Sequence, residues 1–433
     1  MPRPMTSAPP VHERDPVRWT VALALLFCLF AAIRLTTPHS FFFDEVHYLP
    51  AARTILELSH PVNPEHPPLA KQLIALGMLL FGDKALGWRI MPLLFGTLAL
   101  FAATRLMWFA GQRRFATLAT GVLLATGFML FVNSRIAMLD IFMLSFLLVA
   151  LWQFAAACRQ NETARLRLAI TGLSLGAAMA CKWNAIPIAV LPGLYFLAVR
   201  LWSAKWRFLW CRRGTPIGGI SLIEAALWLG LLPVLVYVAS YWPYLFYAKG
   251  SVQPTLAAFV EIQQHALDLQ HKLLRKHPYQ TQWWQWVSNI RGIWYLYEDV
   301  DGAQRGIVLI GNPLTFLLGL PALLWCAFLA VAKRRIDAAA MVVLYAVSLG
   351  LWIVAAKNVQ FFYHYMLPSC FLLGALGIAL DSLWRRGGRV AWLPLLVLAA
   401  SAGLFLYFWP ILSAAPLDSV TEYHKWMWLR TWR

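Results

Sequence analysis

Acidic side chains are scarce in this chain of 433 residues: 19 Asp and Glu stand against 37 Lys and Arg, a formal net charge of +18. Charged residues of both signs make up only 13% of the sequence, about half the share found in soluble domains. No polar stretch is long enough to form a basic soluble domain. The composition therefore excludes a soluble globular enzyme and gives no support to nucleic-acid binding.

Cysteine motifs are missing as well. The six cysteines have no CxxC spacing, so neither a disulfide framework nor a zinc site is predicted. The sequence also lacks internal repeats, low-complexity tracts in its apolar part, and paired broken helices in matching halves, which are typical of transporters.

Apolar residues dominate the chain. They make up 60% of it, and the mean hydropathy is +0.62. A soluble core of this size could not bury so much apolar surface, so the sequence predicts an all-α polytopic membrane protein. Runs of about 20 apolar residues predict eleven spans: Trp19–Leu35, Trp88–Phe109, Phe115–Val132, Ile136–Ala157, Leu168–Cys181, Ala185–Leu201, Leu222–Phe246, Ile307–Ala332, Ala338–Ala355, Phe361–Leu380 and Ala391–Ile411. The run Leu69–Phe81 is too short to span and predicts an interfacial or re-entrant helix.

Positive charge sets the orientation. With eleven spans, the short Arg- and Lys-rich loops all fall on one side, which the positive-inside rule makes cytoplasmic. We therefore expect a disordered cytoplasmic tail over 1–17, a transmembrane domain over 18–412, outer loops over 36–87 and 247–306, and an extracytoplasmic tail over 413–433. The Trp- and Arg-rich inner loop Trp202–Gly219 is typical of an interfacial amphipathic segment.

The first outer loop carries FDEVHY (Phe43–Tyr48) and HPPLAK (His66–Lys71). Carboxylates, histidines and a lysine held together beside a bilayer indicate a reactive site. Lys71 is a natural phosphate partner. A structural interpretation stays open, because Ser40 or Asp44 can cap a helix over Glu45–Leu58.

Further ionisable residues lie in or beside the predicted spans: Arg34, Arg89, Arg135, Asp140, Lys182 and His364. Such residues are costly in lipid unless they are paired or functional. The four cations fall at the outer ends of spans. They either snorkel to headgroups or form an anion site with the first outer loop. Asp140 is close enough in sequence to neutralise Arg135.

The second outer loop is rich in aromatic residues. It contains His277, Pro278 and Tyr279, followed by two aromatic groups: Trp283, Trp284 and Trp286, then Trp294, Tyr295 and Tyr297. An interfacial aromatic belt and a surface that stacks on a sugar or peptide, with His277 as a hydrogen-bonding group, are both compatible with this pattern.

Seven motifs follow one another along nearly the whole chain: FDEVHY, HPPLAK, SRIAMLD (Ser134–Asp140), GLSLGAAMACKW (Gly172–Trp183), HPYQTQWWQW (His277–Trp286), GNP (Gly311–Pro313) and YHYMLP (Tyr363–Pro368). In this order they resemble the protein O-mannosyltransferase family of the GT-C superfamily. The resemblance implies an eleven-span GT-C core with a catalytic acid pair matching Asp44 and Glu45, and Arg34, Arg89 and His277 match further family residues. It also implies mannose transfer from a polyprenyl- or dolichyl-phosphate donor to Ser or Thr of exported proteins. The second outer loop has no room for the β-trefoil-like insert of eukaryotic members, so a compact bacterial form in the inner membrane is expected.

The residues suggest how such a transfer would proceed. We expect inverting transfer with Asp44 as general base and with Lys71, Arg89, Arg135, Lys182 and Arg34 on the leaving phosphate. The residues expected to position these groups are Glu45, His47, His66, Asp140, His277 and Tyr279. No metal-ligand spacing is present, and the need for a divalent metal stays open. Two alternatives remain: a GT-C transferase acting on lipid A or another glycan, and a membrane transporter. The sugar, the acceptor, the carrier length and a homodimeric state also stay open.

Overall fold

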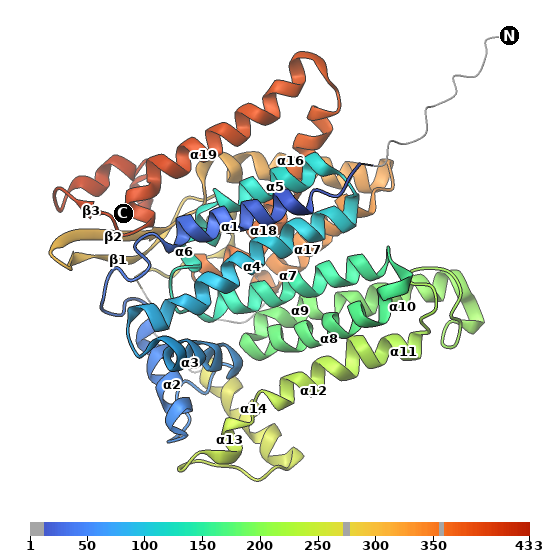
Figure 1. The fold of residues 1–433 in the computed structure, drawn as a ribbon, viewed down its shortest axis with the longest axis horizontal. Helices are drawn as coiled ribbons and strands as arrows, with labels where there is room; N and C mark the ends of the chain where they lie inside the picture. The colour runs from blue at the N-terminus through green and yellow to red at the C-terminus, as the bar shows by residue number, and fades with distance from the viewer. Residues whose placement is uncertain (1–12, 272–277, 355–358) are drawn as a thin grey trace.

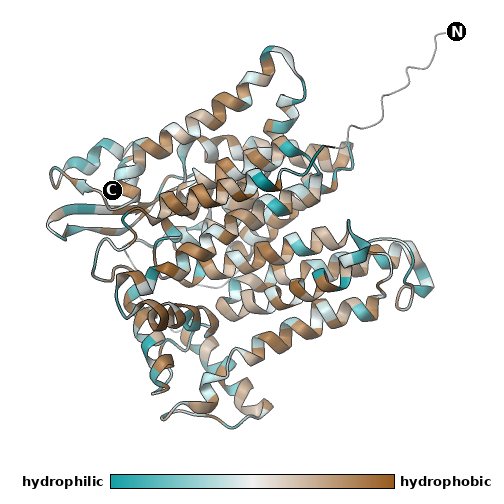
Figure 2. Ribbon diagram, viewed as in Figure 1, coloured by the Kyte–Doolittle hydropathy of each residue, from teal (hydrophilic) through white to brown (hydrophobic). Residues whose placement is uncertain are grey.

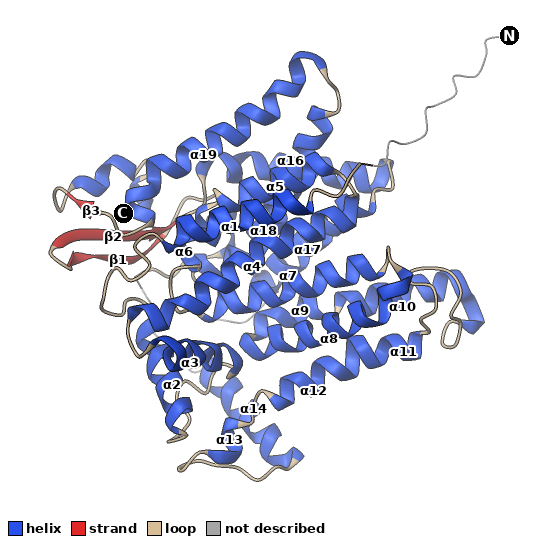
Figure 3. Cartoon of the chain, viewed as in Figure 1, coloured by secondary structure: helices blue, strands red, loops and turns tan. Residues whose placement is uncertain are grey.

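The computed structural model describes residues 13–271, 278–354 and 359–433. Over these residues the chain forms a bundle of long helices with a small sheet at one end (Figures 1 and 3). Nine helical stretches in the described part are long and apolar enough to cross a bilayer. The predicted class, an all-α polytopic membrane protein, is confirmed, whereas the count of eleven spans stays a prediction.

Those nine stretches contain the following helices: α4 (Ala85–Gly111), α7 (Leu139–Ala157), α8 (Ala164–Cys181), α9 (Ile186–Ala189) with α10 (Leu191–Ala204), α11 (Leu222–Ala226) with α12 (Leu232–Ala239) and α13 (Pro243–Phe246), α16 (Pro313–Ala332), α17 (Ile336–Val354), α18 (Met366–Trp384) and α19 (Trp392–Leu412). The other two predicted spans coincide with α1 (Val17–Ala32) and with α5 (Arg114–Ala125) followed by α6 (Phe128–Asn133).

Helices α7 and α18 form the centre of the bundle, because most of their residues are buried among other helices. The stretch Leu222–Phe246 lies at the periphery; most of its residues are apolar (Figure 2), and few of them are buried. It packs closely on α8 through two glycines four residues apart. A Cβ at Gly172 would lie 2.1 Å from the Trp228 carbonyl oxygen, and one at Gly176 would lie 2.5 Å from that of Pro233. Small residues at this spacing allow helix backbones to approach in membranes.

Shorter helices cluster at one end of the bundle (Figure 1): α2 (Glu45–Glu57), α3 (Leu69–Phe81) and α14 (Leu256–His271). The short helix α15 (Trp283–Val287) packs on α17. The bounds of α3 are those of the apolar run that the sequence predicts as a short helix. We call this end the outer end, because it contains both predicted outer loops.

A three-stranded antiparallel sheet also lies at the outer end. It consists of β1 (Ile293–Val300), β2 (Ala303–Leu309) and β3 (Pro416–Leu417). The hairpin turns at Asp301-Gly302, whose φ angles of 51° and 72° fit a two-residue turn. The predicted span from Ile307 is therefore wrong at its start, because residues 307–309 belong to β2. The last four residues of β2 are all buried, so this strand resembles an apolar run that continues into α16.

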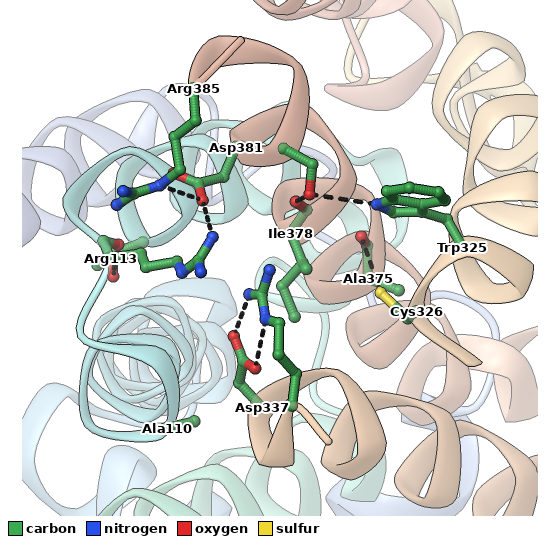
Figure 4. A network of polar contacts seen from close by, with 12 residues as sticks. Ala110, Arg113, Trp325, Cys326, Asp337, Ala375, Ile378, Asp381 and Arg385 are labelled. Carbon is green, nitrogen blue, oxygen red and sulfur yellow. Dashed lines mark hydrogen bonds and ion pairs between the residues drawn. The ribbon is translucent and has the colours of Figure 1, made fainter. Parts of the chain in front are cut away.

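The opposite end of the bundle holds a network of ion pairs (Figure 4). Asp381 is fully buried and accepts hydrogen bonds from Arg113 at 2.8 Å and Arg385 at 2.9 Å. Arg385 also pairs with Glu13, and Asp15 pairs with Arg105. Acidic residues from the N-terminal segment and α18 thus hold part of the positive charge at this end.

Candidate active site

Asp44 sits at the start of α2 on a constrained backbone. The preceding residue, Phe43, has a positive φ of 49°, and its ring stacks on Tyr295 at 4.1 Å between centroids. Asp44 occupies the N-cap position, and its side chain makes no capping hydrogen bond to the helix. The predicted helix from Glu45 is confirmed, but capping by this side chain is not what the structure shows. The carboxylate is half-buried at the outer end of the bundle.

Glu45 is fully buried, and both of its carboxylate oxygens accept hydrogen bonds from other protein groups. Its Oε1 accepts from Arg89 Nε at 2.9 Å and from the Ala137 backbone N–H at 3.1 Å, and its Oε2 accepts from Arg89 Nη2 at 2.8 Å and from the Phe42 N–H at 3.2 Å. Arg89 also donates to the carbonyl oxygens of Pro38 and Ser40, at 2.5 Å and 2.8 Å. The Arg89 guanidinium therefore binds protein groups, whereas the sequence predicts that it binds the donor phosphate.

Arg135 and Arg34 likewise bind backbone groups. Arg135 is buried and donates to the carbonyl oxygens of Ala31 at 2.5 Å and Ile33 at 2.6 Å. Arg34 donates to Ser413 Oγ at 2.6 Å. These contacts tie the end of α1 to the end of α19. In this geometry both arginines hold the outer ends of helices together, which differs from the predicted contact with a phosphate.

Asp140 and Lys182 form a buried ion pair, with Lys182 Nζ 2.7 Å from Asp140 Oδ2. The expectation that Asp140 neutralises Arg135 is wrong. Asp140 lies on the first turn of α7, which packs on α8, and Lys182 directly follows α8. Lys182 Nζ also lies 5.1 Å from the centre of the Tyr363 ring. An aspartate from the start of α7 and a lysine from the end of α8 thus form one buried pair.

Lys71 is almost fully buried on the first turn of α3. Its Nζ donates to the carbonyl oxygens of Asn63 at 2.6 Å and His66 at 2.9 Å. Burial lowers the pKa of Lys71 to about 7, and the charge of Glu65 acts in the opposite direction. The His66 ring lies edge-on to Tyr48 at 6.3 Å, whereas the His47 side chain is exposed.

Tyr48 lies close to several of these ionisable groups. Burial raises the pKa of its phenol well above the usual value, and three nearby carboxylates raise that pKa further: Asp44, Asp140 and Glu65. Burial also raises the pKa of Tyr295, with added effects from Asp140 and Asp44. The Tyr295 hydroxyl donates to Asn133 Oδ1 at 3.2 Å. Side chains from α2, α7 and β1 therefore surround one polar region. Tyr48, Tyr295 and Tyr363 were not predicted as site residues, although all three lie in segments singled out in the sequence.

The other predicted positions lie around this region. His277 lies outside the described residues, and Tyr279 is half-buried. Trp286 is fully buried and donates to Thr281 Oγ1 at 2.7 Å, so it belongs to the core, whereas Trp283 and Trp284 are exposed. His364 is buried and stacks on Trp352 at 3.8 Å. Over the described ranges, no three His, Cys, Asp or Glu side chains come together to hold a metal ion.

Carboxylates, lysines and phenols gathered at the outer end of an apolar bundle suit group transfer at a membrane surface. The fold matches the solved S. cerevisiae protein O-mannosyltransferase Pmt1–Pmt2 complex bound to the sugar donor. The TM-score is 0.80, with 14% identity over 97% of this chain and 93% of that chain. This likeness shows that the chain has the fold of that complex.

Two family models match the sequence. Residues 65–242 match dolichyl-phosphate-mannose-protein mannosyltransferase, and residues 255–432 match the C-terminal four-span region of protein-O-mannosyltransferase. The chain belongs to the protein O-mannosyltransferase family. It is an enzyme, and the transporter alternative is wrong.

Two curated relatives differ in how much of the chain they match. The Corynebacterium glutamicum polyprenol-phosphate-mannose–protein mannosyltransferase is 28% identical over 90% of this chain and 88% of its own length. A Pseudomonas aeruginosa undecaprenyl phosphate-alpha-4-amino-4-deoxy-L-arabinose arabinosyl transferase is also 28% identical, but over only 53% of this chain and 43% of its own length.

Proposed function

We propose that this enzyme transfers mannose from a polyprenyl-phosphate donor to Ser or Thr hydroxyls of exported proteins. The relative from C. glutamicum supports the donor and the protein acceptor, because its match extends over both halves of the chain. We place the reaction at the outer face of a bacterial inner membrane, where the donor's isoprenoid tail lies in the bilayer. The S. cerevisiae relative is a complex of two chains, which leaves a dimer of this protein as a reasonable expectation.

The proposed reaction is a single displacement with inversion. Asp44 takes the proton of the acceptor hydroxyl as its oxygen bonds to the anomeric carbon. The bond from that carbon to the phosphate oxygen breaks, and its electron pair stays on the polyprenyl phosphate. Lys71 and Lys182 stabilise the negative charge that develops there, by exchanging their present contacts with the carbonyl oxygens of Asn63 and His66 and with Asp140 for the phosphate. Glu45, Arg89, Arg135 and Arg34 are assigned to positioning, since their contacts hold the first outer loop and the helix ends.

One observation carries this assignment: the electrostatic environment of the Tyr48 hydroxyl. Burial raises the pKa of this hydroxyl, and the charges of Asp44, just before α2, and of Asp140 on α7 raise it further. The Tyr48 ring lies 6.3 Å from the ring of His66, whose carbonyl oxygen binds Lys71 at 2.9 Å. Carboxylate and lysine groups from separate segments thus meet in one region, as a base and a phosphate site require.

The test replaces Asp44 by Asn. Removing a general base usually slows turnover by about two to four orders of magnitude, while binding of the donor lipid should stay within a few-fold of wild type. Transfer to an acceptor peptide and binding of the polyprenyl-phosphate sugar are measured on the same purified protein. Glu57→Gln, an exposed position on the same helix, is the matched control and should keep full activity. An Asp44→Asn enzyme with wild-type turnover would falsify the role of Asp44.

A second candidate is transfer of a sugar to lipid A or another glycan. The P. aeruginosa relative is named for transfer of a different lipid-linked sugar, without an acceptor in its name, and its match is limited to about half of the chain. The acceptor separates the two candidates, and incubation of the enzyme with donor and either acceptor distinguishes them directly.

A further inference from the structure

The segment 201–213, which covers the end of α10 and the first part of the loop before α11, exposes an unusual set of side chains. Trp202, Trp206 and Trp210 are 87%, 97% and 74% exposed. Four cations are exposed beside them: Lys205, Arg207, Arg212 and Arg213. The sequence has no Asp or Glu between Arg200 and Leu222. The segment 201–213 therefore exposes three indoles and four positive charges and contains no acidic residue.

This loop has an organised backbone. Arg200 is fully buried and donates to three carbonyl oxygens of the loop, those of Arg213 at 2.5 Å, Ile217 at 2.8 Å and Ile220 at 2.6 Å. The Gly219 N–H bonds the Arg212 carbonyl oxygen at 2.7 Å. The exposed indoles and cations are thus presented by a segment whose backbone is held by the buried Arg200 guanidinium.

The position of the loop indicates what covers it. It joins two membrane-length stretches and lies at the end of the molecule opposite α2 and α3 (Figure 1). Tryptophan prefers the headgroup level of a bilayer. Clustered Lys and Arg next to spans attract anionic lipids. Indoles that alternate with cations match a surface where apolar and phosphate groups lie at one depth.

We propose that the segment 201–213 is a binding surface for the headgroups of anionic phospholipids. The phosphates contact Lys205, Arg207, Arg212 and Arg213, and the indoles insert between neighbouring headgroups. The surface is remote from the proposed active site, so it serves to hold α10 and α11 at a fixed depth in a charged leaflet.

The test measures which lipids the full chain retains. The protein is reconstituted in nanodiscs of phosphatidylglycerol and phosphatidylcholine, extracted with mild detergent, and analysed by native mass spectrometry for bound lipid. Wild type should retain phosphatidylglycerol in preference to phosphatidylcholine. Replacing the four loop cations by Gln should weaken that retention by about fivefold for each charge at low ionic strength. Trp206→Ala should reduce it while keeping the charge.

A matched control neutralises four exposed cations on other loops at the same end of the molecule: Lys333, Arg334, Arg386 and Arg389. This control should keep most of the lipid preference. Equal lipid retention by the loop variant and wild type, or an equal loss in the control, would overturn the proposal. Sugar transfer by the loop variant should stay at the wild-type level, which separates this test from that of Asp44.

Discussion

Adjacent carboxylates on α2 have different surroundings. Asp44 and Glu45 are consecutive, yet Glu45 is fully buried against Arg89 and two backbone N–H groups, while Asp44 is half-buried near Tyr48 and Tyr295. Consecutive residues at a helix start point in directions about 100° apart, so one can enter the core while the other faces the site. This difference in environment suggests a structural role for one acid and a chemical role for the other.

Replacing Glu45 by Gln should destabilise the fold. The Arg89 guanidinium would stay buried without its counter-charge, and breaking a buried pair by removing one partner typically costs about 3–5 kcal/mol. The midpoint of thermal unfolding in detergent should fall clearly, whereas Glu57→Gln should leave it unchanged. A Glu45→Gln protein with the stability of wild type would show that Arg89 does not depend on this pair.

The lowered pKa of Lys71 leads us to expect that donor binding depends on pH. Burial lowers its pKa to about 7, so the free enzyme loses the ammonium charge as the pH rises through that value. The sugar phosphodiester keeps its negative charge over this range, and donor affinity should therefore fall between about pH 6 and about pH 8. Lys71→Arg stays charged and should flatten this dependence; Lys71→Met should bind weakly at every pH. Binding isotherms of the donor lipid provide the measurement, and a pH-independent wild type would exclude Lys71 from the phosphate site.

At the level of elements, the sequence predicts helix bounds better than contacts between residues far apart in the chain. The bounds of α3 follow from an apolar run. The start of α2 directly after Asp44 is also as predicted, although the Asp44 side chain makes no capping hydrogen bond. The hairpin β1–β2 was missed, although Asp301-Gly302 is a strong turn signal, because the buried end of β2 resembles a membrane segment. The partners of Glu45 and Asp140 could not be inferred either, since Arg89 and Lys182 lie 44 and 42 residues away.

The short length of α3 predicts the topology around it. If α3 stays in the outer leaflet, residues on both sides of it face outward. In a cysteine-free background, Glu57→Cys and Lys84→Cys should both react with a membrane-impermeant maleimide on intact cells. Gln112→Cys, beyond α4, should react only after permeabilisation. Labelling of Glu57→Cys without Lys84→Cys would mean that α3 crosses the bilayer, and the orientation of every later helix would reverse.

On the scale of the whole molecule, the two ends of the bundle differ in chemistry. The outer end gathers buried carboxylates, lysines and phenols around Tyr48. The opposite end has two features. Salt bridges neutralise Asp381 there, and the cationic segment 201–213 is exposed. A lipid-linked donor fits this division, because its tail can lie in the bilayer while its phosphate reaches the outer end.

Deletion of the gene tests which molecule accepts the sugar. If exported proteins are the acceptors, Ser- and Thr-linked hexose should disappear from the secreted proteome while the glycolipids keep their composition. Both fractions are measured by mass spectrometry in the deletion strain, in a strain complemented with the wild-type chain, and in one complemented with Asp44→Asn. Only the wild-type chain should restore the modification, because the Asp44→Asn protein is present in the membrane but lacks the proposed base. Unchanged protein hexosylation together with an altered glycolipid would instead identify a glycan as the acceptor, without contradicting the role of Asp44.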